Sequence, residues 1–91
     1  MICQIKLPEE LQRFADNEPR VAAEGDTIAV LLRDLGRRLP DLAERILDGD
    51  GRLYAHLVVL YNDAPLPHAS HETTPVESDA TIELFIAASG G

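Results

Sequence analysis

With 91 residues and a mass of 10.0 kDa, the chain is long enough for one domain and too short for two. Hydrophobic residues make up 45% of it and charged residues 26%, which is typical of a folded globular domain. Its formal net charge of -8 disfavours binding to nucleic acid or to an anionic membrane surface, because both would repel it.

The first predicted element is a strand over residues 1–7, where apolar and polar side chains alternate. Pro8 ends this strand, and Leu11 with Phe14 predicts a short helical turn over the core. A polar turn over residues 16–19 leads into a second strand, Arg20–Glu24. We therefore expect an N-terminal hairpin, and the inward side chains of its first strand are Met1, Cys3, Ile5 and Leu7.

A helix follows the hairpin. Residues 25–27 read Gly-Asp-Thr, and the Asp or Thr side chain can accept a hydrogen bond from an amide of the first turn. Pro40 interrupts the helix after Leu39, and residues 42–47 predict a second short helix before a turn at residues 48–51. The first helix carries one apolar stripe, formed by Ile28, Leu31, Leu32, Leu35 and Leu39.

The second half of the chain predicts three more strands. Residues 54–61 are apolar on both parities, which indicates a strand covered on both faces. A turn at residues 62–63 leads to a short strand at residues 64–66, and an irregular surface loop then extends to Thr74. The last strand covers residues 80–87.

The order hairpin, helix, two strands and final strand predicts an α+β fold of the β-grasp type. We expect a mixed sheet of four to five strands, with one main helix on one face. A split α/β sandwich fits less well, because only one helix is long enough to cover a sheet. Residues 1–87 then form the domain, and residues 88–91 form a flexible tail.

The tail ends in Gly90 and Gly91, which a stable fold does not require. Two glycines at a chain end can simply lower local order. Directly after the last strand, however, an extended tail would carry its carboxylate about 17 Å beyond Ala87. Without a Cβ on its last two residues, it could thread a channel too narrow for other side chains and reach the ATP of a partner.

Short motifs in a fixed order strengthen this interpretation. They are Leu7-Pro8 followed by Leu11, Gly25-Asp26-Thr27, Leu39-Pro40-Asp41-Leu42 with Arg45, Tyr61-Asn62-Asp63 and the final Gly90-Gly91. Over essentially the whole chain they resemble the ubiquitin-like sulfur carrier family of MoaD and ThiS. The length and residues 47–53 resemble the molybdopterin-synthase small subunit and the cysteine-forming carrier of actinobacteria more than the shorter thiamine carrier.

This resemblance implies that the Gly91 carboxylate is adenylated by a ubiquitin-activating-type enzyme and converted to a thiocarboxylate that donates sulfur. The chain itself would bind no cofactor, because the ATP belongs to the activating partner. A second partner would be the synthase, or large subunit, that accepts the sulfur. The chain is then a carrier and not an enzyme.

The last strand also predicts a docking surface. The parity of Phe85 is opposite to that of its apolar neighbours, which places it on the helix-free face near the tail. Val58 and Leu60 could join it in an apolar patch, and Ser89 would contact the partner beside Gly90. A half-covered core position for Phe85 is the alternative. Because residues 53–91 contain five acids and no Lys or Arg, we expect a basic partner surface to steer association.

Other candidate sites are weaker. Cys3 predicts a small buried side chain, not a sulfur-bearing group. His68 and His71 have no third metal ligand with defined geometry, so a solvated loop fits them better. Asp48 and Asp50 begin like a calcium loop, but Arg52 stands where a third ligand belongs, which indicates a turn. No metal site is therefore expected.

Two other functions remain open at this point. The chain could be a ubiquitin-like modifier joined to target lysines through Gly91, or an acidic β-grasp subunit that only completes a partner's active site. No basic, apolar signal peptide begins the sequence, so a cytoplasmic protein is expected.

Overall fold

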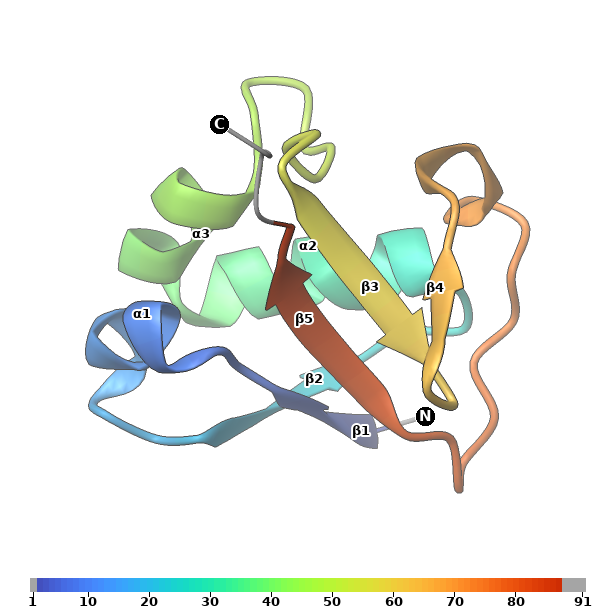
Figure 1. The fold of residues 1–91 in the computed structure, drawn as a ribbon, viewed down its shortest axis with the longest axis horizontal. Helices are drawn as coiled ribbons and strands as arrows, with labels where there is room; N and C mark the ends of the chain where they lie inside the picture. Colours follow the sequence, from blue (N-terminus) through green and yellow to red (C-terminus); the bar gives the residue numbers. More distant parts are fainter. Residues whose placement is uncertain (1, 88–91) are drawn as a thin grey trace.

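A computed structural model of the chain describes residues 2–87 and contains one five-stranded sheet (Figure 1). The strands are β1 (Ile2–Lys6), β2 (Arg20–Glu24), β3 (Leu57–Tyr61), β4 (Ala64–Leu66) and β5 (Ile82–Ile86). Their order is β2-β1-β5-β3-β4. β5 pairs parallel with β1 and antiparallel with β3, so the last strand of the chain occupies the centre of the sheet. The predicted β-grasp fold is confirmed.

The helices leave one face of this sheet open. They are α1 (Glu9–Gln12), the 3-10 turn η1 (Arg13–Ala15), α2 (Ile28–Arg38), α3 (Pro40–Ile46) and the 3-10 turn η2 (His68–Ser70). In Figure 1, α2 crosses behind the sheet, and the strands face the viewer without a helix in front of them. We call this uncovered side the open face.

The start of α2 is fixed by a side chain and by a distant loop. The Thr27 hydroxyl accepts a hydrogen bond from the Val30 amide at 3.3 Å, as the Gly-Asp-Thr motif predicts. The amides of Ile28 and Ala29 donate to backbone carbonyls of the loop at residues 71–74. That loop is therefore held against the N-terminus of α2, where helical amides lack partners within the helix.

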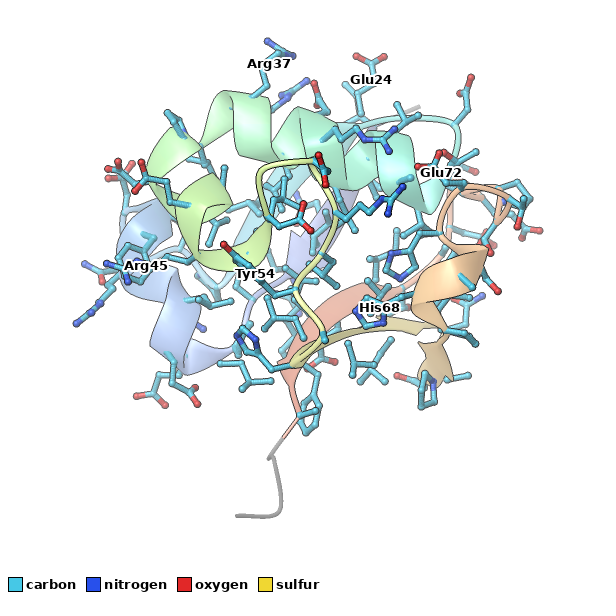
Figure 2. The ribbon with its side chains drawn as sticks, turned by 90° about the horizontal axis from the view of Figure 1, so that it is seen from above. Glu24, Arg37, Arg45, Tyr54, His68 and Glu72 are labelled. Carbon is cyan, nitrogen blue, oxygen red and sulfur yellow. The ribbon has the colours of Figure 1, made fainter. Side chains whose placement is uncertain are left out.

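The end of β2 is also tied to α2. The Glu24 amide donates to the Asp34 carboxylate at 2.7 Å, and Arg37 and Arg38 form ion pairs with the same group. The Glu24 amide and these two guanidinium groups hold the pKa of Asp34 at about 2. Figure 2 shows Glu24 and Arg37 on the same side of the molecule.

The core lies between α2 and the covered face of the sheet. The predicted stripe of α2 is buried, except that Leu39 after the helix is only partly covered. Inward side chains of the strands meet it, and those that are less than 3% exposed are Ile5, Ala23, Leu57, Val59, Ile82 and Leu84. The alternation in the first and last strands therefore predicts correctly which side chains point toward the core.

Some boundaries differ from the prediction. The strand expected from residue 54 begins at Leu57, because the Tyr54 amide donates to the Ile46 carbonyl at the end of α3. The last strand covers residues 82–86 instead of 80–87. The second helix begins at Pro40, which is favourable at a first helical position because that amide needs no partner.

Candidate functional site

The open face carries an apolar patch near the end of β5. Phe85 is 50% exposed and stands directly opposite Val58 in the β3–β5 pairing. Leu60, on the same face of β3, is half-buried and stands opposite Glu83. We call Phe85, Val58 and Leu60 the β5 patch. Phe85 thus lies on the open face and outside the hydrophobic core, so the alternative of a core position does not hold. A docking role for the patch stays a prediction.

The chain leaves the sheet beside this patch. The Ala87 amide donates to the His56 carbonyl at 2.9 Å, which extends the β3–β5 pairing one residue beyond β5. The last described residue, Ala87, is therefore hydrogen-bonded to the sheet. Ser89, Gly90 and Gly91 lie outside the described residues, so the roles predicted for them stay predictions.

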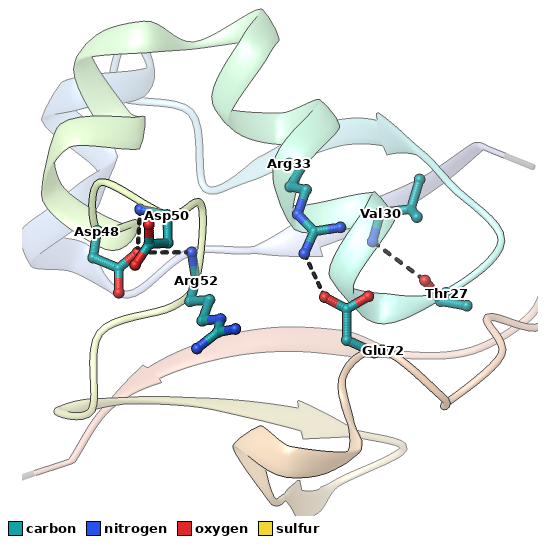
Figure 3. A network of polar contacts seen from close by, with 7 residues as sticks. All are labelled: Thr27, Val30, Arg33, Asp48, Asp50, Arg52 and Glu72. Carbon is teal, nitrogen blue, oxygen red and sulfur yellow. Dashed lines mark hydrogen bonds and ion pairs between the residues drawn. The ribbon is translucent and has the colours of Figure 1, made fainter.

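The Asp48 segment is a turn, as predicted. Its carboxylate accepts hydrogen bonds from the amides of Asp50 and Arg52 at 2.8 and 3.0 Å (Figure 3). These two bonds lower the pKa of Asp48, because both favour the ionised carboxylate. One oxygen of this carboxylate, Oδ1, thus accepts both backbone hydrogen bonds, which hold residues 48–52 in the turn.

The prediction of a solvated loop is wrong for one of the two histidines. His71 is only 6% exposed, and its Nε2 atom has no hydrogen-bond partner among the described residues, whereas His68 is exposed. The rings stack with centroids 5.1 Å apart. Burial and the neighbouring His68 lower the pKa of His71, so its imidazole is neutral at pH 7. The His71 carbonyl bonds to α2, which draws the residue inward.

A cavity of about 370 Å³ lies on the α2 side of the sheet, and no sequence pattern predicts it. It separates α2 from the loop at residues 48–55 and from η2. Its polar lining includes Arg33, Arg52, Tyr54, His68, His71 and Glu72. Figure 2 labels three of these residues, Tyr54, His68 and Glu72. Arg33 and Glu72 form an ion pair at its wall (Figure 3).

Three further observations concern Cys3, metals and membranes. Cys3 is 5% exposed and buried in the core, as predicted. Within residues 2–87, no three ligating side chains are grouped so that they could hold a metal ion. In the same part of the chain, no helix combines the length and apolar character needed to cross a bilayer.

One cluster at the end opposite β4 was not predicted. The guanidinium groups of Arg13 and Arg45 lie 4.8 and 4.7 Å from the centroid of the Phe14 ring. Both contacts are cation–π interactions; the Arg13 contact lies within η1, and the Arg45 contact joins η1 to α3. Local periodicity carries no signal for the Arg45 contact, because Arg45 is distant in sequence from the ring.

The comparisons with known proteins agree with this geometry. The ThiS family profile matches residues 5–91. The chain belongs to the ThiS family. The resemblance to the MoaD and ThiS carriers is thereby confirmed at the level of the family, and the match includes the final glycines.

Individual relatives of this ThiS-family chain are distant in sequence but similar in length. The sulfur carrier protein CysO of Mycobacterium tuberculosis is 22% identical over 89 residues, which is 96% of each chain. A structure of SAMP1 from Haloferax volcanii is 26% identical, with a TM-score of 0.80 and full coverage of both chains. A chain of the BexX/CysO complex of Amycolatopsis orientalis is 22% identical, with a TM-score of 0.80 over 97% of this chain and 98% of that one.

Proposed function

We propose that this ThiS-family chain is a sulfur carrier whose Gly91 carboxylate is the reacting group. The observation that carries the proposal is the family match, which continues through residue 91. A relative matched over 96% of its length is named a sulfur carrier protein, which supports the same function. The chain itself is not an enzyme, and it acts in the cytoplasm.

A free carboxylate is a poor electrophile, so it must first be activated. An adenylating enzyme of the ubiquitin-activating type transfers AMP from ATP to the Gly91 carboxylate and releases pyrophosphate. A sulfur nucleophile then attacks the carbonyl carbon, AMP leaves, and a thiocarboxylate remains. The ATP site belongs to the enzyme, and the carrier supplies only the carboxylate and a surface that positions it.

A synthase or large subunit then accepts the sulfur. Molybdopterin-type cofactors and cysteine are the two products that the proposal includes. The name CysO of the relative supports the second. The CysO of Amycolatopsis orientalis was solved in a complex with BexX, which supports the expectation that this chain works with a protein partner.

The test is a mass measurement. The chain is incubated with the adenylating enzyme of the same organism, ATP and a sulfur source. We expect the intact mass to rise by about 16 Da as sulfur replaces oxygen, with the change on the C-terminal peptide, because only that carbonyl is within reach of the nucleophile. Omitting ATP is the control. An unchanged mass with a demonstrably active enzyme would contradict the proposal.

A second candidate function is protein modification. The 26% identical SAMP1 structure favours it, because SAMP1 stands for small archaeal modifier protein 1. In that case Gly91 would form isopeptide bonds with lysines. Finding the chain covalently attached to other proteins in a lysate would support this alternative. If deletion of Gly90 and Gly91 left its biological activity intact, both functions would be wrong, and only a role as an interaction subunit would remain.

The β5 patch gives a prediction about binding. Phe85→Ala is expected to weaken association with the adenylating enzyme by about 2 kcal/mol or more, because exposed aromatic side chains are frequent anchors of interfaces. Titration calorimetry measures the loss. Since the ring is 50% exposed, thermal unfolding of the free variant should change little. An unfolded variant, or unchanged affinity, would show that Phe85 is not a docking residue.

A further inference from the structure

Two cationic side chains lie opposite each other on the open face, at the end of the β1–β2 pairing that is next to the connecting segment. Lys6 and Arg20 are direct cross-strand partners, and both side chains are exposed. Like charges in this position repel and destabilise a sheet. The chain has 16 acids and only eight basic residues, so an unlike pair would have been the common outcome. The stability of the hairpin therefore does not explain why two cations are paired here.

Within the described part of the chain, no acidic group neutralises this pair. Neither Lys6 nor Arg20 forms an ion pair with any of residues 2–87. Glu83 stands beside Lys6 in the parallel register of β1 and β5, but it makes no ion pair with it within that same part of the chain. By contrast, three arginines of α2 all have acidic partners, and they are Arg33, Arg37 and Arg38.

A hollow of about 270 Å³ lies at this cationic pair. Its lining is Gln4, Lys6, Arg20, Ala80, Thr81 and Ile82. Every polar side chain in this set can donate a hydrogen bond, and no acid belongs to it. Such a set of donors complements an ionised carboxylate, which can only accept hydrogen bonds and which pairs most strongly with guanidinium and ammonium groups.

The hollow and the β5 patch lie on either side of Glu83. Lys6 is in register with Glu83, and Glu83 stands opposite Leu60 of the patch. Phe85 shares the face of Glu83, because the two residues have the same parity on β5. A protein that covers the patch therefore also reaches the cationic pair without crossing an edge of the sheet.

We propose that an acidic side chain of the adenylating enzyme docks in the hollow between Lys6 and Arg20. This inference rests on the proposed function, since it names the chemistry of that partner's contact surface. The carboxylate would take a forked pair of hydrogen bonds from Arg20 and one from Lys6, and its charge would offset their repulsion. The partner surface then combines an apolar socket for Phe85 with a local acid.

The test compares two charge reversals that alter net charge equally. Arg20→Glu changes the hollow, whereas Arg52→Glu changes a loop residue beside the cavity on the α2 side. We expect Arg20→Glu to lower kcat/KM of the adenylating enzyme for the carrier by about tenfold or more. The new glutamate would face the acidic side chain of the enzyme, and the two negative charges would repel each other. Arg52→Glu should leave kcat/KM near the wild-type value. ATP–pyrophosphate exchange measures both.

The outcomes separate local contact from long-range charge. Equal effects of the two variants would show that only net charge matters and would overturn the inference, as would unchanged kinetics in Arg20→Glu. Arg20→Gln, which removes the cation without adding an acid, should give a smaller loss of the same sign. It also serves as the test if Arg20→Glu fails to fold. Absence of exchange with the wild-type chain would refute the proposed function and this inference together.

Discussion

An alanine added after Gly91 is expected to abolish sulfur loading completely. The reacting carbonyl must lie within roughly 3 to 3.5 Å of its attacking group, and one extra residue displaces the terminal carboxylate by more than 3 Å. The extension leaves the β5 patch and the cationic pair unchanged. Intact-mass analysis after incubation with the adenylating enzyme, ATP and a sulfur source should therefore show the unmodified extended chain.

The matched control is the same alanine added before Met1. This variant should load sulfur like the natural chain, because the carboxylate keeps its distance from the domain. Mass analysis before incubation must confirm that the C-terminal alanine is still present. If the extended chain then gained sulfur at the same rate, the carrier function proposed for Gly91 would be wrong.

Replacement of Gly25 by alanine is expected to destabilise the fold by about 3 kcal/mol, at the upper end of the usual cost of overpacking. A Cβ at this buried position would lie 2.5 Å from the Leu31 nitrogen and 2.9 Å from the Leu31 Cα. Both are backbone atoms of α2, so no side-chain rotation can relieve the contact. Urea unfolding followed by circular dichroism measures the change in the free energy of unfolding.

Gly49→Ala is the matched control for this substitution. No atom lies within 4 Å of the Cβ that it would add, so the space is open. We expect its effect to stay within about 1 kcal/mol, with a small gain from the reduced freedom of the unfolded chain. If Gly25→Ala proved equally harmless, the close approach of residue 25 to α2 would not be a constraint on the fold.

Most of the fold could be predicted because its elements have local signals. The stripe of α2, its Gly-Asp-Thr start and the alternation in β1 each depend on residues a few positions apart. The strand limits Arg20–Glu24 and residues 64–66 were predicted correctly for the same reason. The β-grasp topology then followed from the order of the elements, since few topologies accommodate a hairpin, a crossing helix and a returning strand.

The errors arise where long-range contacts override local pattern. Residues 54–56 are apolar enough for a strand, but the Tyr54 amide bonds to the end of α3. His71 lies in a polar, proline-flanked loop, yet its carbonyl bonds to Ala29 and its ring is buried. Similarly, Phe85 could be placed on the open face from parity alone, whereas the pairing of Lys6 with Arg20 depends on the register of the hairpin.

The central position of β5 has a consequence for how the carrier is synthesised. Pairing of Ile5 with Ile82 closes a loop that includes most of the chain, so the two hairpins can be joined into one sheet only after nearly the whole sequence has been made. A chain that stops before residue 82 would leave β1 and β3 with unpaired edges, which favours aggregation and degradation. Truncated molecules would therefore not persist as folded competitors that occupy the activating enzyme without a reactive end.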